Sequence, residues 1–237
     1  AYSQQIFSLS RSLLDTVQEM QDLKAGHLTL GASTTPGEFI LPSAVGQFRQ
    51  IYSGIQVELI IGNTRSIIQR ILDREMDLGM VGEHVTEHSN ELEMIDYMDD
   101  EIVLVAAPTH PAAQRRIVSP QQVSELGLVV REQGSATRSA AEKHFLELGV
   151  SPNVAIELGS NQAVKQAATA GGGIGVISRL GVTAEVRAGM LTVLNVDGWN
   201  CRRPLTLVHP KDRYLSPSQR AFKEFLVAQR PTPSTES

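Results

Sequence analysis

Two hydroxyl-rich turns hold the residues best suited to binding a polar ligand. The first spans residues 31–37 and contains Ser33, Thr34 and Thr35, and the second spans residues 132–138 and contains Ser135 and Thr137. Each turn follows a short apolar, strand-like run and precedes a helix-like pattern, and the first turn of a helix exposes backbone N–H groups that favour anions. One such turn can be a helix cap and nothing more. Two of them, about a hundred residues apart, predict two halves of one cleft for a small polar or anionic ligand.

Three further polar residues join this predicted site. Thr64 follows a predicted strand and either caps the next helix or faces the ligand. Arg138 either pairs with Glu142 on its own helix or reaches the ligand. Ser178 ends another predicted strand, where it is expected to point into the cleft. The complete predicted ligand-binding set is Ser33, Thr34, Thr35, Thr64, Ser135, Thr137, Arg138 and Ser178.

The remaining motifs predict no catalytic, metal or cofactor site. The glycine-rich run 171–175 follows a helix-like pattern and precedes a strand, whereas a phosphate-binding glycine loop follows a strand and opens a helix. We therefore expect a helix C-terminus there. His84 and His88 have helical metal-ligand spacing, but they lack the HExxH order and a nearby cysteine. We expect no enzyme activity, although a catalytic triad scattered along the chain stays open.

Composition narrows the function classes further. The chain has 237 residues, 41% of them hydrophobic and 20% charged, which is typical of a globular protein large enough to divide into two lobes. No apolar run approaches the ~20 residues that cross a bilayer. The single cysteine, Cys201, excludes an internal disulfide and suits a reducing compartment. With a net charge of -5 and scattered basic residues, this stretch of chain is not expected to bind DNA by itself.

The sequence predicts one N-terminal helix followed by alternating strands and helices. Residues 2–24 carry an apolar stripe at helical spacing, which predicts either a helix packed on its own domain or a helix that dimerises. Further strands are predicted at 27–32, 55–61, 77–81, 92–97, 102–107, 128–131, 154–158, 174–178, 191–196 and 205–209. Helices are predicted near 41–51, 64–72, 136–148, 161–170 and 216–228. This alternation favours parallel sheets, with a second lobe beginning near Glu101.

The order of these landmarks resembles the effector-binding regulatory domain of LysR-type transcriptional regulators. The resemblance covers roughly residues 1–230, including part of the linker helix, and rests on several motifs in order. Ser33–Thr35 with residues 39–42 is most similar to the branch of sulfur-assimilation and carbon-fixation regulators. The other matching segments are Phe48-Arg49, residues 57–59, residues 76–79, residues 103–105, His110-Pro111, Glu132, Thr137-Arg138 and residues 173–177.

The resemblance implies an α/β fold of two Rossmann-like lobes, similar to type 2 periplasmic binding proteins, with an effector between them. It implies a linker and dimerisation helix at 1–25, lobe I at 26–99 and 202–230, lobe II at 100–201 and a disordered tail at 231–237. It also implies a cytoplasmic homodimer, a tetramer when full length, that meets DNA only through an N-terminal helix-turn-helix domain outside this sequence. The expected effector is a sulfur oxyanion or a carboxylated metabolite.

Two alternatives remain at this point. One is a periplasmic solute-binding protein of the same fold, which would be expected to start near its first strand rather than with an amphipathic helix. The other is an enzyme of the same two-lobed architecture, but no acid–base or cofactor motif in the sequence supports it.

Overall fold

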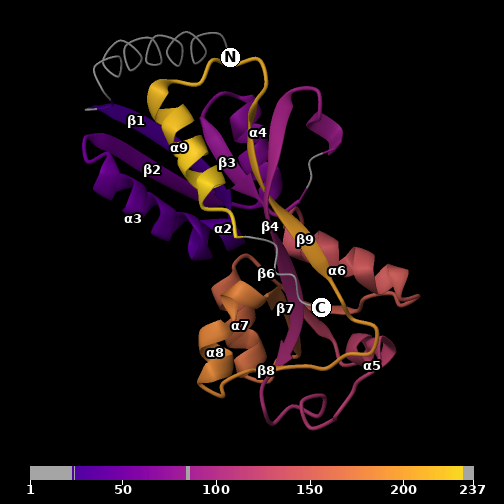
Figure 1. Cartoon of the computed structure of the whole chain (residues 1–237). Helices are drawn as coiled ribbons and strands as arrows, with labels where there is room; N and C mark the ends of the chain where they lie inside the picture. Colours follow the sequence, from indigo (N-terminus) through magenta and orange to yellow (C-terminus); the bar gives the residue numbers. More distant parts are fainter. Residues whose placement is uncertain (1–22, 24, 84–85, 232–237) are drawn as a thin grey trace. The chain divides into compact units, whose positions relative to one another are not determined.

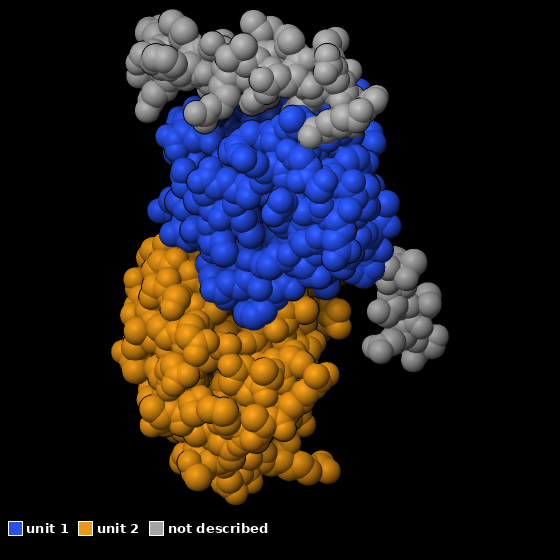
Figure 2. Space-filling view, turned by 90° about the vertical axis from the view of Figure 1, so that its left-hand side faces the viewer, with its two compact units in different colours: residues 1–98, 204–237 blue, residues 99–203 orange. Residues whose placement is uncertain are grey.

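The chain folds into two compact units (Figures 1 and 2). The computed structural model describes residues 23, 25–83 and 86–231. Unit 1 consists of residues 1–98 and 204–237, and unit 2 of residues 99–203. The predicted helix at 1–25 lies outside the described residues except at positions 23 and 25, and the predicted tail at 231–237 lies outside them except at position 231. Strands β4 (Leu92–Ala106) and β9 (Arg202–Pro210) carry the chain between the units.

Unit 1 contains a sheet in the order β2-β1-β3-β9. Its first three strands are β1 (Gly26–Ser33), β2 (Ile55–Gly62) and β3 (Leu78–Val81). They are mutually parallel, whereas β9 joins β3 antiparallel. The register places Ser33 opposite Gly62, so that β1 and β2 end together at one edge of the sheet.

The described part of unit 1 also contains four helices and a short 3₁₀ turn. The elements are α2 (Thr34–Phe39), α3 (Leu41–Ile51), α4 (Thr64–Leu72), α9 (Pro217–Ala228) and the 3₁₀ turn η1 (Thr86–His88). Helix α4 buries Ile67, Ile68 and Ile71, which recur at helical spacing. The rings of Phe48 in α3 and Phe222 in α9 meet edge-on at 5.0 Å and join the two helices.

Unit 2 contains its own sheet in the order β4-β7-β5-β6. Its strands besides β4 are β5 (Leu128–Arg131), β6 (Val154–Leu158) and β7 (Ile174–Ser178), with the short β8 (Thr192–Val193) against β4. Strand β5 runs parallel to β6 and β7, so the carboxyl ends of these three strands share one edge. The helical elements are α5 (Pro120–Glu125), α6 (Ala136–Glu147), α7 (Asn161–Thr169), the 3₁₀ turn η2 (Arg179–Gly181) and α8 (Thr183–Arg187).

The predicted α/β alternation is confirmed, with three corrections. Residues 92–97 and 102–107, predicted as two strands, form the single strand β4, because the intervening acidic residues remain in extended backbone. The strand predicted at 191–196 is only β8, residues 192–193. Helices α2 (Thr34–Phe39), α5 and α8 were not predicted, since five or six residues are too few to show a periodic apolar face, and α2 occupies most of the turn predicted at 31–37. The glycine run 171–175 follows α7 and leads into β7, as predicted, with Gly171 and Gly173 at positive φ.

A buried ion pair explains how β4 tolerates its acidic stretch. The carboxylate of Asp100 accepts hydrogen bonds from Arg203 Nε at 2.9 Å and from Ser178 Oγ at 2.6 Å. The side chains of Asp100 and Arg203 are 0% and 4% exposed. The network ties β4 to β9 and β7, so the charge that interrupts the sequence pattern is compensated inside unit 2.

Loss of this pair should be costly. We expect Arg203→Met to lower the free energy of unfolding by about 3–5 kcal/mol, because it leaves the Asp100 charge buried without its cation. The matched control is Arg70→Met, which breaks the exposed pair with Glu75 and should cost less than about 1 kcal/mol. Urea denaturation of both variants tests this, and equal losses would contradict it.

Candidate functional site

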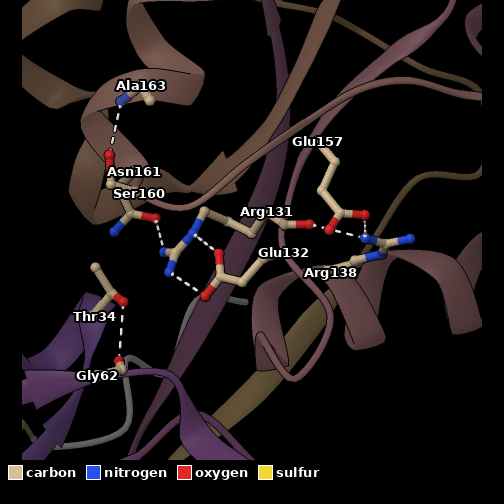
Figure 3. A network of polar contacts seen from close by, with 9 residues as sticks. All are labelled: Thr34, Gly62, Arg131, Glu132, Arg138, Glu157, Ser160, Asn161 and Ala163. Carbon is tan, nitrogen blue, oxygen red and sulfur yellow. Dashed lines mark hydrogen bonds and ion pairs between the residues drawn. The ribbon is translucent and has the colours of Figure 1, made fainter.

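The carboxyl edge of the unit 1 sheet brings two polar turns together. Strands β1 and β2 are parallel neighbours, and helices α2 and α4 begin directly after them. The hydroxyl of Thr34 donates a hydrogen bond to the carbonyl oxygen of Gly62 at 3.1 Å, which joins the two turns (Figure 3). The predicted residues Ser33, Thr34, Thr35 and Thr64 therefore lie on one edge and are all buried.

Two of these hydroxyls have no partner. Ser33 Oγ and Thr64 Oγ1 are buried side-chain oxygens without a hydrogen bond, although Ser33 is only 6% and Thr64 only 2% exposed. An unsatisfied buried hydroxyl costs about 1–3 kcal/mol. A protein retains such groups most readily where they have a use in another state, such as binding a ligand.

The structure corrects the reading of Thr64 as a helix cap. The N-cap of α4 is Asn63, whose side chain accepts a hydrogen bond from the backbone N–H of Ser66 at 2.9 Å. Thr64 is the first residue of the helix, so its hydroxyl is not needed for capping. Ser33 does occupy the N-cap position of α2, but its side chain makes no capping hydrogen bond.

Electrostatics at this edge favour an anion. Neither α2 nor α4 carries an acidic residue in its first turn, so the helices' own first turns do not oppose the partial positive charge of the two helix starts. Helix α2 packs tightly on β2, since a Cβ placed on Gly37 of α2 would come within 2.9 Å of the Ile61 side chain of β2. The small residues of the turn thus keep the backbone N–H groups close to the sheet edge.

Unit 2 presents a comparable edge at the ends of β5, β6 and β7. Ser135 is the N-cap of α6 and makes no side-chain bond to the helix, and Thr137 lies buried in its first turn. Helix α7 begins after Ser160, which accepts a hydrogen bond from Ala163 N at 3.1 Å. The first turns of α6 and α7 also contain no acidic residue.

A buried arginine that the sequence analysis missed organises this second edge. Arg131 donates a hydrogen bond to Asn161 Oδ1 at 2.8 Å (Figure 3). It also donates to both carboxylate oxygens of Glu132, at 2.8 and 3.0 Å. It is 3% exposed and Asn161 only 1%. The sequence did contain a signal for this residue: an arginine at the end of an apolar strand, followed directly by a glutamate. Such a pair indicates a buried guanidinium, because a buried guanidinium requires a carboxylate.

Arg138 forms the predicted pair on its own helix. Its Nε donates to Glu142 at 2.7 Å, and its terminal nitrogen contacts Glu157 and the carbonyl oxygen of Arg131. Burial alone would lower the pKa of Arg138, but the hydrogen bonds to Glu142 and Glu157 outweigh it and leave the pKa raised. The cation is held in place by two carboxylates and by a backbone carbonyl.

Ser178 and Cys201 lie within the Asp100 region of unit 2. Ser178 Oγ donates to Asp100 and accepts from Leu180 N at 3.2 Å, so the hydroxyl caps η2 as well as closing the ion-pair network. Cys201 is an unpaired, buried thiol, and desolvation raises its pKa to about 12.

The predicted site residues thus fall into one group of four in unit 1 and one group of four in unit 2. Among the residues that the structure describes, no three histidine, cysteine, aspartate or glutamate side chains cluster as metal ligands, and His84 lies outside that part of the chain. The described helices also include none with the length and apolarity needed to span a membrane.

Comparison with known proteins identifies the family to which this chain belongs. Residues 21–231 match the family described as the LysR substrate binding domain. The chain is 32% identical to the HTH-type transcriptional activator CmpR of Synechocystis over 95% of its own length and 73% of CmpR. It is also 32% identical to the RuBisCO operon transcriptional regulator of Allochromatium vinosum, over 96% of the chain and 74% of that regulator. The regulatory domain of CcmR from Synechocystis, solved in complex with 2-PG, superposes with a TM-score of 0.80 at 31% identity, covering 87% of this chain and 98% of CcmR's.

The unpartnered hydroxyls of unit 1 make a distinctive stability prediction. Thr64→Val should raise the free energy of unfolding of the ligand-free protein by about 1 kcal/mol, because it removes an unsatisfied buried oxygen at nearly constant volume. Thr34→Val should lower it by about 1 kcal/mol, because the hydroxyl bonded to Gly62 is lost. Urea titration measures both. If Thr64→Val destabilises the protein as Thr34→Val does, the Thr64 hydroxyl has a partner in solution.

Proposed function

We propose that this chain, which belongs to the LysR family of transcriptional regulators as a substrate-binding domain, senses a small anion through the hydroxyl-bearing helix starts of unit 1. Its relatives are transcription regulators, and small-molecule sensing is the role of this domain. The α/β fold is that of LysR effector-binding domains, which are similar to type 2 periplasmic binding proteins.

The observation that carries the proposal is the pair of buried hydroxyls without partners, Ser33 Oγ and Thr64 Oγ1. Ser33 is the last residue of β1 and Thr64 lies just after the end of the parallel neighbour β2, and both are beside helix starts that contain no acidic residue. Hydroxyls and free backbone N–H groups are donors without charge. An oxyanion gains hydrogen bonds from them and satisfies oxygens that the protein leaves unpaired.

Unit 2 is proposed to supply the second set of donors. Ser135 and Thr137 lie at the start of α6, where Ser135 leaves the helix uncapped by its side chain. Thr35 in unit 1 and Ser178 in unit 2 stay in the predicted set, although the Ser178 hydroxyl is bonded to Asp100. We propose that Arg138 positions the end of β5 instead of contacting the ligand, because its carboxylate partners hold it against the carbonyl oxygen of Arg131. That one ligand contacts both sets stays a prediction.

The ligand class follows from the donors and from the relatives. CcmR, whose regulatory domain is 31% identical to this chain, was solved with 2-PG. We therefore place 2-PG first among the ligands to test, followed by sulfate as a sulfur oxyanion and by carboxylated metabolites. Metal ions and redox cofactors are not part of the proposal.

The wider assignment follows from the family. We propose that the protein is a cytoplasmic regulator and not an enzyme, and that DNA is bound by a helix-turn-helix domain outside these 237 residues. The net charge of -5 supports this division, because a DNA-binding surface requires concentrated Lys and Arg. A solute-binding protein for transport, the alternative, has less support, because the relatives are regulators.

A binding experiment tests the proposed site. Ser33→Ala and Thr64→Val should each weaken binding by roughly 5- to 150-fold, since an oxyanion would lose one hydrogen bond worth about 1–3 kcal/mol and each 1.4 kcal/mol is tenfold. Isothermal titration calorimetry with 2-PG and with sulfate measures this. Thr109→Val, at an exposed position of unit 2, is the matched control and should bind as the parent does.

These variants distinguish an effect on ligand affinity from an effect on protein stability. Thr64→Val is expected to stabilise the ligand-free protein, so weaker binding by this variant cannot be attributed to unfolding. Unchanged affinity of both variants for a ligand that the parent binds would remove unit 1 hydroxyls from the site.

The association state is a second proposal. Cyclic twofold dimers are the commonest oligomers, and the apolar stripe of residues 6–20 supports a homodimer, with a tetramer for the full-length regulator. Sedimentation velocity of the 237-residue chain should show a dimer at micromolar concentration. A monomer throughout would refute the dimer for this stretch of the protein.

A further inference from the structure

We propose that Arg65 makes the anion site of unit 1 selective for doubly charged oxyanions over singly charged ones. The inference rests on the proposed function and goes further, because it names the charge of the ligand and the residue that recognises this charge. Arg65 is the second residue of α4, directly after Thr64, and it is exposed. It does not belong to the set of residues that the sequence predicted to bind the ligand.

The start of α4 keeps free backbone donors beside the buried Thr64 hydroxyl. The first N–H groups of a helix have no partner within the helix, and in α4 that of Ser66 donates to the side chain of the cap, Asn63. For the N–H groups of Thr64 and Arg65, no partner lies among the residues that the structure describes. Two backbone donors and one unpartnered hydroxyl are therefore together in the first turn of this nine-residue helix.

Burial makes these donors a site for a ligand and not for bulk water. Thr64 is 2% exposed, so water has little access to its hydroxyl. An oxyanion at the start of α4 would accept hydrogen bonds from the hydroxyl and from backbone N–H groups at once, and the partial positive charge of the helix end favours it.

Arg65 is placed to add a full charge to this site. The Cα–Cβ bonds of a helix tilt toward its N-terminus, so the Arg65 side chain starts in the direction of the free N–H groups. Its guanidinium forms no hydrogen bond or ion pair with any residue that the structure describes. Arg131 and Arg138 of unit 2, by contrast, are paired with carboxylates. An anion bound at α4 therefore meets a cation that has no carboxylate to give up.

The position of Arg65 is unfavourable for the helix itself, which supports a role in binding. A cation destabilises the positive N-terminal end of a helix and stabilises the C-terminal end. Arg70 of the same helix lies in the last turn, where a cation is favoured, and pairs with Glu75 at 2.9 Å. Arg65 has neither of these stabilising interactions, whereas a bound anion would supply a partner for it.

The charge of Arg65 is what links the site to the charge of the ligand. Hydroxyl and N–H donors are neutral and hydrogen-bond to singly and doubly charged oxyanions alike. A cation attracts each negative charge, so its attraction for a dianion is about twice that for a monoanion. The ligand class is therefore a tetrahedral dianion, such as sulfate or a phosphate monoester, ahead of a monocarboxylate.

Calorimetric titration of the complete 237-residue chain with sulfate and with methyl sulfate tests the proposal, because these two tetrahedral anions differ in charge. Arg65→Gln should lower the preference for sulfate, measured as the ratio of the two dissociation constants, by roughly fivefold or more. Arg65→Lys keeps the charge and should keep this ratio within about twofold of the parent's. The matched control is Arg49→Gln, which removes an exposed cation from the last turn of α3, just before β2 begins. It should leave the ratio unchanged.

A ratio that falls in Arg65→Gln alone supports the proposal. An equal fall in Arg49→Gln assigns the effect to the general charge of the protein and overturns it. So does an equal fall in Arg65→Lys, or a ratio that Arg65→Gln leaves unchanged; if Thr64→Val still weakens sulfate binding in that case, the proposed function stands without Arg65. A parent chain that does not bind sulfate also overturns the proposal, whereas the proposed function is then judged by the titration with 2-PG. Arg65→Gln removes a cation from the positive end of α4 and should not lower the urea midpoint of unfolding, so weaker binding cannot be attributed to unfolding.

Discussion

Burial of polar groups is the constraint on which most of this architecture depends. Asp100 lies inside the strand that carries the chain from one unit to the other, and its charge is tolerated because Arg203 and Ser178 bond both of its oxygens. The same requirement places Arg131 against Glu132 and Asn161 at the end of β5. Both networks lie in unit 2, at the ends of β5 and β7, where the strands give way to helical segments.

The edge of unit 1 and the edge of unit 2 differ in whether their hydrogen-bond donors already have partners. At the edge of unit 2, Arg131 and Arg138 are each paired with carboxylates, so these two cations are already neutralised. Unit 1 instead leaves Ser33 Oγ and Thr64 Oγ1 unsatisfied, although both are buried. An incoming anion gains more from donors that lack partners than from cations that must first give up a carboxylate. Unit 1 is therefore the more suitable anchor for the charged part of a ligand.

The sequence predicted the βα order and the positions of the hydroxyl turns because both depend on local pattern. Strands such as 128–131 and helices such as α4 show their buried face directly in the spacing of apolar residues. The predictions were wrong where long-range pairing outweighed local pattern. The acidic stretch of β4 resembles a loop until Arg203, about a hundred residues away, is seen to neutralise Asp100. Asn63 was overlooked as the cap of α4 because Thr64 and Asn63 are both good capping residues and lie side by side. The family assignment was confirmed, since it rested on the order of many weak motifs over the whole chain.

The lone thiol of Cys201 has a practical consequence for studying this protein. Desolvation raises the pKa of this buried thiol to about 12, so very little of it is thiolate near pH 7. The thiolate is the nucleophile that attacks maleimide and disulfide reagents, so Cys201 of the native protein should react with them only very slowly. A cysteine introduced at an exposed position would be the single reactive handle on the molecule. Fluorophores or spin labels could therefore report on either unit without a cysteine-free background having to be engineered first.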